Sequence, residues 1–234
     1  MKRGHRFAAL IAVFAACTAA SSPPSALSAA QRHDLLLRYA ACVAAREPET
    51  VRTFLFERGR AEDRGEFDRL GSKECVVEAG VRDFRTFRAQ AAALAGAWGE
   101  LALKAVPASL EASFAGLPPL LHVREQSMAE FDPKGRLSRE RFAARVANSN
   151  RDRQIMLLGE CAVRAAPAQS RAFVETAFGS AEERAAVLPL GPALQGCVGA
   201  GSVKLLPQQL RGALAYNYMR LAVAADPSLK ARLF

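Results

Sequence analysis

Cysteine is the residue type whose number and spacing most narrowly limit the chemistry of this chain. Four cysteines, Cys42, Cys75, Cys161 and Cys197, lie beyond the N-terminal region, and a fifth, Cys17, lies within it. Four thiols could hold zinc, but the chain has no C-x-x-C spacing of the kind found in structural zinc sites. In an exported chain, four cysteines predict two disulfides rather than nucleophiles or redox thiols.

The second half of the chain repeats the first, with the cysteines in register. Shifts of 119, 120 and 122 residues align, in order, Cys42 with Cys161 and Pro48 with Pro167, "GRAEDR" (59–64) with "GSAEER" (179–184), and Cys75 with Cys197. Ordered matches of this kind indicate an internal duplication. If one unit once existed alone, its two cysteines bonded to each other, so we expect Cys42–Cys75 and Cys161–Cys197. Pairing across the units is the alternative.

Basic residues gather between the two copies, in a stretch from Pro107 to Arg153 that has no counterpart. The seven cations of its second half are Lys134, Arg136, Arg139, Arg141, Arg145, Arg151 and Arg153. We expect an anion-facing surface here, and a solvated linker is the alternative. The stretch "DPKGRLS" faintly resembles a calcium loop, but Lys134 and Arg141 stand where oxygen ligands are required, which excludes it.

No catalytic motif is found in the mature chain. It has two histidines, His33 and His122, and lacks the H-E-x-x-H, G-x-S-x-G, S-x-x-K and phosphate-loop patterns. The acids Glu182 and Glu183 lie in the first turn of a predicted helix. Acidic residues there are expected to interact favourably with the helix dipole rather than to act as a general acid and base. We therefore expect no catalytic residue, metal or cofactor. An enzyme of hydrolytic type, with a site in the groove between the units, is the alternative function.

The N-terminus is typical of a secretory signal peptide over residues 1–28. Lys2, Arg3 and Arg6 precede an apolar run that is shorter than the roughly 20 residues of a membrane span, and no later segment qualifies as one. Cleavage is expected near 28–30, and lipoprotein cleavage before Cys17 is the alternative. Removal of the signal peptide with these three cations lowers the formal net charge from +9 to +6. A basic exported protein suits an acidic envelope protein or an anionic surface, and nucleic acid is excluded as a partner by the export route.

The elements that position these residues are predicted to be helices. Asp34 is expected to cap a first helix that buries Tyr39 and Cys42, and Pro48 and Pro167 are each expected to start a second one, which in the first copy buries Val51, Phe54 and Leu55. In "GSAEER", Gly179 fits a left-handed helix end, Ser180 an N-cap and Glu183 a capping box. Ser138 is expected to start a short helix that buries Phe142 and Val146. The apolar segments 86–105 and 207–224 are expected to form the core, with Trp98, Tyr216 and Tyr218 as packing residues.

The repeated pattern resembles a group of exported bacterial proteins. It reads Cys-x5-Pro, Gly-x-Ala-Glu-acid-Arg, Leu-Gly, a second Cys, and "LRGALA" before a Tyr-containing helix. In these features the chain resembles uncharacterised exported Cys-paired helical repeat proteins of sphingomonad-type alphaproteobacteria. The resemblance covers most of the mature chain and implies a bacterial envelope location, but the group has no assigned activity, so no functional residue follows from it. The first copy departs from the pattern, reading "FRAQAA" where the second reads "LRGALA".

The sequence therefore predicts an all-α protein of two duplicated units, each pinned by its own disulfide. Unit 1 spans 31–106, the basic insert 107–153 and unit 2 154–234. The expected function is that of a non-enzymatic binding module in the periplasm or outside the cell, or anchored in the membrane through Cys17. The ligand is unknown, and an acidic envelope protein or an anionic surface suits the basic insert.

Overall fold

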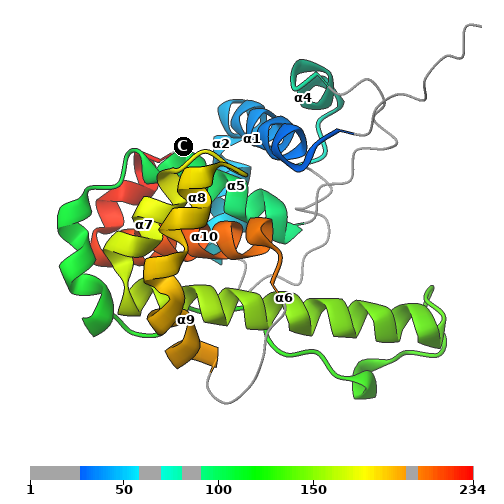
Figure 1. Ribbon diagram of the computed structural model, residues 1–234. Coiled ribbons are helices and arrows are strands. Elements are labelled where there is room, and N and C mark those ends of the chain that lie inside the picture. The colour runs from blue at the N-terminus through cyan, green and yellow to red at the C-terminus, as the bar shows by residue number, and fades with distance from the viewer. Residues whose placement is uncertain (1–26, 58–69, 81–90, 199–204, 234) are drawn as a thin grey trace, which may run out of the picture.

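The described part of the protein is built from helices. The computed structural model describes residues 27–57, 70–80, 91–198 and 205–233 (Figure 1). Cys17, the "GRAEDR" stretch and most of the predicted signal peptide lie outside these ranges. Within them no strand occurs, and the predicted all-α fold class is confirmed. The α-helices are α1 (Ala29–Arg46), α2 (Pro48–Glu57), α4 (Lys73–Glu78), α5 (Ala91–Leu103), α6 (Arg139–Ala165), α7 (Pro167–Glu175), α8 (Ala181–Ala186), α9 (Gly191–Val198) and α10 (Pro207–Ala225), and the 3-10 helices are η1 (Ala108–Gly116), η2 (Met128–Glu130), η3 (Leu188–Leu190) and η4 (Pro227–Ala231).

Proline starts a helix at equivalent places in the two halves. Pro48 opens α2 and Pro167 opens α7, as predicted. The residues before them, Glu47 and Ala166, have φ/ψ values of −130°/53° and −147°/65°. Proline disfavours the helical conformation in the residue before it, so α1 and α6 end there and the chain turns. The predicted stripe of α2 is confirmed, because Val51, Phe54 and Leu55 are buried.

The first helix begins earlier than predicted. Ser28, not Asp34, is the N-cap: the Ser28 hydroxyl accepts a hydrogen bond from the Gln31 N–H (3.1 Å), and the Gln31 side chain accepts one from the Ser28 N–H (2.8 Å). This reciprocal capping box satisfies two donors at once. Asp34 instead lies inside α1 and pairs with Arg38 at 2.9 Å.

Helix α6 is much longer than the predicted short helix. Ser138 caps it as expected, accepting a hydrogen bond from the Arg141 N–H at 3.3 Å. The helix then runs for 27 residues, which is about 40 Å at 1.5 Å per residue. No glycine or proline interrupts 139–158, so the helix passes through the boundary at Arg153 that was expected between insert and second unit. Its N-terminal half projects beyond the other helices in Figure 1.

The core is centred on α5 and α10, which touch backbone to backbone. A Cβ at Gly96 would lie 2.5 Å from the Gly212 Cα, and one at Gly99 would lie 2.6 Å from the Ala215 carbonyl carbon. Side chains larger than glycine would therefore push the two helices apart. Trp98, Tyr216 and Tyr218 are buried in this region, as predicted.

Helix α10 contributes to two apolar clusters. Tyr216 and Met219 join the cluster formed with α1, α2, α4 and α5, and Leu214 and Tyr218 join the one formed with η1, α6, α7 and η3. The two clusters do not divide strictly by halves of the chain, because Leu103, Val106 and Phe114 belong to the second one. Within the described ranges, no helix combines the length and apolar character of a membrane span.

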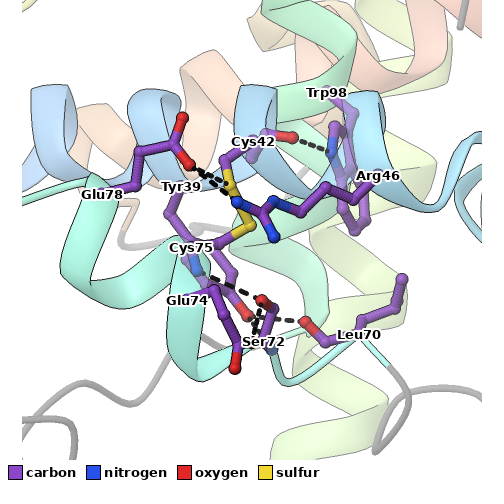
Figure 2. The surroundings of a disulfide bond; sticks show 10 residues. Tyr39, Cys42, Arg46, Leu70, Ser72, Glu74, Cys75, Glu78 and Trp98 are labelled. Atoms are coloured by element: carbon purple, nitrogen blue, oxygen red, sulfur yellow. Dashed lines mark hydrogen bonds and ion pairs between the residues drawn. A yellow bond between two sulfur atoms is a disulfide. The ribbon is translucent and has the colours of Figure 1, made fainter.

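The predicted disulfide pairing is confirmed. Cys42 bonds to Cys75 and Cys161 bonds to Cys197, with sequence separations of 33 and 36. Both cysteines of the first bridge are buried, and Figure 2 shows it enclosed between α1 and α4, with hydrogen bonds from Tyr39 to the Leu70 carbonyl (2.6 Å) and from Trp98 to the Ala40 carbonyl (2.8 Å). In the second bridge Cys161 is exposed. Two such bridges indicate an oxidising compartment. The duplication itself stays a prediction.

Candidate functional site

The predicted anion-facing residues lie on and just before the projecting half of α6. Five of the seven are exposed: Lys134, Arg136, Arg139, Arg141 and Arg151. Arg145 and Arg153 are half-buried. We call residues 124–153 the basic arm.

The arm has its own stabilising contacts. Phe131 and Phe142 pack with ring centroids 5.5 Å apart. The Asn150 side chain exchanges two hydrogen bonds with the Gln126 backbone, each 2.8 Å long. These contacts hold the incoming chain against α6, so the basic residues are carried on an ordered element.

The seven cations form no ion pair with a carboxylate in the part of the chain that the structure describes. Other arginines do pair with carboxylates: Arg38, Arg46, Arg52, Arg164, Arg171, Arg211 and Arg232 elsewhere, and Arg124 at the start of the arm. On and just before the projecting half of α6, these cations outnumber the exposed acids Asp132 and Glu140, which produces a positive local potential.

A buried ion-pair network anchors the base of the arm. Glu160 on α6 lies 2.5 Å from His122 Nε2 and accepts hydrogen bonds from Arg164 (2.7 Å) and the Leu120 N–H (3.0 Å). Burial acts to raise the pKa of Glu160, but the hydrogen bonds from His122, Leu120 and Arg164 outweigh it and lower the pKa from 4.5 to about 2. The Arg164 guanidinium also donates to the carbonyls of Phe114, Leu117 and Pro118. The Pro-pair segment that precedes the arm is thereby fixed to α6.

A small cavity lies where the arm meets the core. Its volume is about 80 Å³, enough for a few water-sized groups. Its walls come from α5, from the segment 121–123, from α6 and from α10, and are formed by Ala92, Leu121, His122, Val123, Ser149, Asp152, Arg153, Met156, Tyr216 and Arg220. Arg153, predicted as part of the surface patch, thus lines a cavity instead.

A second buried network lies at the other end of α10 and is centred on Arg211. Its guanidinium donates to Glu100 (2.8 Å), to Glu183 (3.1 Å) and to the carbonyl of Thr176 (2.7 Å), and also to the carbonyls of Phe173 and Val174. Every N–H of Arg211 therefore has an acceptor. Glu100 also lies 3.1 Å from His33 Nε2, and the His33 ring stacks on Phe178. The network joins α1, α5, α7, α8 and α10.

The "GSAEER" stretch has the predicted backbone roles and one that was not predicted. Gly179 has φ +79°, and the Ser180 hydroxyl accepts a hydrogen bond from the Glu183 N–H at 3.0 Å. The Glu183 carboxylate, expected to bind the Ser180 N–H, accepts from the Gly179 N–H (2.6 Å) and from Arg211. Its role is therefore to close a tertiary network as well as a helix end.

Sequence reasoning missed Arg211, Arg220, Glu100 and the burial of His33. One signal was available: Arg211 and Arg220 stand in a segment predicted to be core, and a charged side chain in a core helix requires a partner. Their partners lie 28 to 111 positions away in sequence, and sequence spacing does not identify them. In the described part of the chain, no group of three His, Cys, Asp or Glu side chains has an arrangement that could hold a metal ion.

Comparison with known proteins identifies no relative. No protein-family model, no curated protein and no solved structure matches this chain.

Proposed function

We propose that this protein is an exported helical binding module whose basic arm binds an acidic surface of a partner protein. The observation that carries the proposal is a set of five exposed cations on and just before the projecting half of α6, none with a carboxylate partner in the described ranges. Complementary charge of this kind speeds association and selects partners of opposite sign.

The composition of the arm favours a protein over a lipid surface as the partner. Helices that bind membranes in the interface present a wide apolar face to the lipid. Among the described residues of the arm, Met128 is the only exposed large apolar side chain, whereas Val146 is buried and Phe142 is half-buried. The arm therefore offers charge and hydrogen-bond donors, which suit carboxylates on a protein.

Export is supported by the N-terminal sequence and by the two disulfides. We propose a periplasmic or secreted location, with attachment through a lipidated Cys17 as the alternative. In either case the arm meets other envelope proteins rather than nucleic acid.

The proposal is tested by neutralising the arm. The variant Arg136→Gln/Arg139→Gln/Arg141→Gln removes three exposed cations, and its control, Lys73→Gln/Lys104→Gln/Arg184→Gln, removes three exposed cations elsewhere. Cross-linking in the native envelope identifies partners, and binding of the purified partner is then measured in a salt series. We expect an acidic partner whose association rate falls about tenfold with the arm variant, falls steeply with salt and is unchanged with the control.

Three results would contradict the proposal. Salt-independent binding, or an equal loss of partner binding in the control variant, would show that the arm does not recognise the partner. Arm-dependent binding to phosphatidylglycerol vesicles without a protein partner would replace the protein by a membrane surface. Turnover of ester or amide substrates would favour the hydrolytic alternative, which requires a nucleophile hydrogen-bonded to a base; the contacts of His33 and His122 described above are with Glu100 and Glu160.

A further inference from the structure

The cavity at the base of the arm contains a buried arginine, Arg220, that forms no ion pair with the described residues. Arg220 is 8% exposed. Its Nη2 donates to the Leu121 carbonyl at 2.6 Å, and its guanidinium lies 5.2 Å from the centroid of the Tyr216 ring. Among the residues that the structure describes, no carboxylate pairs with it. A buried charge without an opposite charge is unfavourable, so this position favours an added anion.

A second guanidinium on the cavity wall is also incompletely satisfied. Arg153 Nε is buried and has no hydrogen-bond partner in the described structure. Arg153 comes from α6 and Arg220 from α10, and both line the same cavity. Guanidinium groups bind carboxylates and oxyanions through paired N–H donors. The two arginines thus provide donors from two elements toward one small space.

The other residues that line the cavity indicate which class of anion would fit it. Ser149, His122 and Asp152 add polar groups. Ala92, Val123 and Met156 add apolar surface. Phosphate, which has no hydrocarbon part, would leave the apolar wall uncovered. A monoanion with a short hydrocarbon tail matches both parts of the wall.

We infer that this cavity binds a small organic monocarboxylate, with Arg220 and Arg153 holding the carboxylate and the apolar wall holding the short tail. This site is separate from the exposed cations of the arm, because Arg153 lines the cavity and none of the five exposed cations does. A bound carboxylate would supply the counter-charge that the described residues do not supply to Arg220.

The test is a titration of the full mature protein with propionate, followed by NMR chemical shifts. We expect saturable shifts at 121–123 and 149–156. Arg153→Gln removes a donor, and Ala92→Leu fills the cavity while leaving both arginines. Each should weaken propionate binding about tenfold or more, because a hydrogen bond to a charged group contributes on that scale. Arg141→Gln, an exposed arm residue, is the control and should bind propionate like the unaltered protein.

Other outcomes would overturn the inference. No saturable shift, or unchanged binding in Ala92→Leu, would show that the cavity is not the site. Tighter binding of phosphate than of propionate would overturn the assignment to monocarboxylates. Ala92→Leu and Arg153→Gln alter partly exposed positions, and circular dichroism verifies that each variant is folded before it is titrated.

Discussion

Arg211 and Arg220 lie nine residues apart on α10, and both guanidinium groups are buried, but their surroundings differ. Arg211 donates to two carboxylates and three carbonyls. Arg220 donates to one carbonyl and lies over an aromatic ring beside a cavity. The comparison shows that one helix carries an arginine whose N–H donors all have acceptors within the fold and another with a single hydrogen bond to a carbonyl.

The difference follows from which elements meet each end of the helix. At the Arg211 end, the last residues of α7 present free carbonyls, and α5 and α8 each supply a glutamate. At the Arg220 end, the neighbours are the segment 121–123 and the middle of α6, where Glu160 is already paired with His122 and Arg164. Glu160 is thus engaged elsewhere, and the α6 carboxylate that lines the same cavity as Arg220 is Asp152.

The largest effect is expected from breaking the Arg211 network. Arg211→Gln leaves Glu100 and Glu183, both less than one-tenth exposed, without their shared cation. We expect the free energy of unfolding to fall by about 3–5 kcal/mol, the range for removing one partner of a buried ion pair. Denaturant unfolding followed by circular dichroism measures this. Arg184→Gln on the surface of α8 is the control and should change stability by less than about 0.5 kcal/mol. A loss below about 1 kcal/mol for Arg211→Gln would contradict the role given to the network.

The second effect concerns Glu160, which fixes His122 on the cavity wall. Its pKa of about 2 in the folded protein lies below the ordinary 4.5. Ionised Glu160 therefore stabilises the fold fully above pH 4.5, and this contribution is lost as the pH falls toward 2. We expect a contribution of roughly 2–4 kcal/mol. The difference in unfolding free energy between the unaltered protein and Glu160→Gln, measured from pH 6 to pH 2.5, should shrink across this window. A difference that stays constant with pH would argue against an ionised Glu160.

The third effect separates Arg220 from Arg211. Arg220→Gln removes one hydrogen bond and the contact with Tyr216 but leaves no described carboxylate unpaired. We expect a loss of about 1–2 kcal/mol, clearly less than for Arg211→Gln under the same conditions. Equal losses would mean that Arg220 has a structural role of the same kind as Arg211. Arg220→Lys keeps the charge but not the planar set of donors, so its free energy of unfolding should lie between those of the unaltered protein and Arg220→Gln.

The sequence predicts much of the backbone but little of this polar architecture. Pro48, Pro167, Gly179 and Ser180 act locally, so their helix starts and ends could be predicted, and the register of the repeat predicted both disulfides. The continuity of α6 was missed because Asn148, Ser149 and Asn150 are weak helix formers, yet no glycine or proline stops the helix there.

The candidate site was predictable only in part, because some of its residues are far apart in the sequence. The seven basic residues of the arm lie close together in the sequence, within 134–153, and five of them are exposed as expected. Arg153 and Arg220 share a cavity although 67 positions separate them, and they meet only because α6 packs on α10. A Cβ at Gly159 would lie 2.8 Å from the Ala213 carbonyl carbon, and this close contact of the two helices is a tertiary feature with no local sequence signal.

The smallest effect on stability is expected from the exposed cations of the arm. Arg139→Gln/Arg141→Gln removes two charges that have no carboxylate partner in the described ranges. Because exposed charges contribute little to folding, we expect the free energy of unfolding to change by less than about 0.5 kcal/mol. Binding to the acidic partner should weaken, whereas propionate binding in the cavity should be unchanged. Denaturant unfolding and the two binding assays together distinguish an effect of the arm on partner binding from an effect on the stability of the core. A large loss of stability would mean that these arginines hold the arm in place, and they would then belong with Arg211 rather than with a recognition surface.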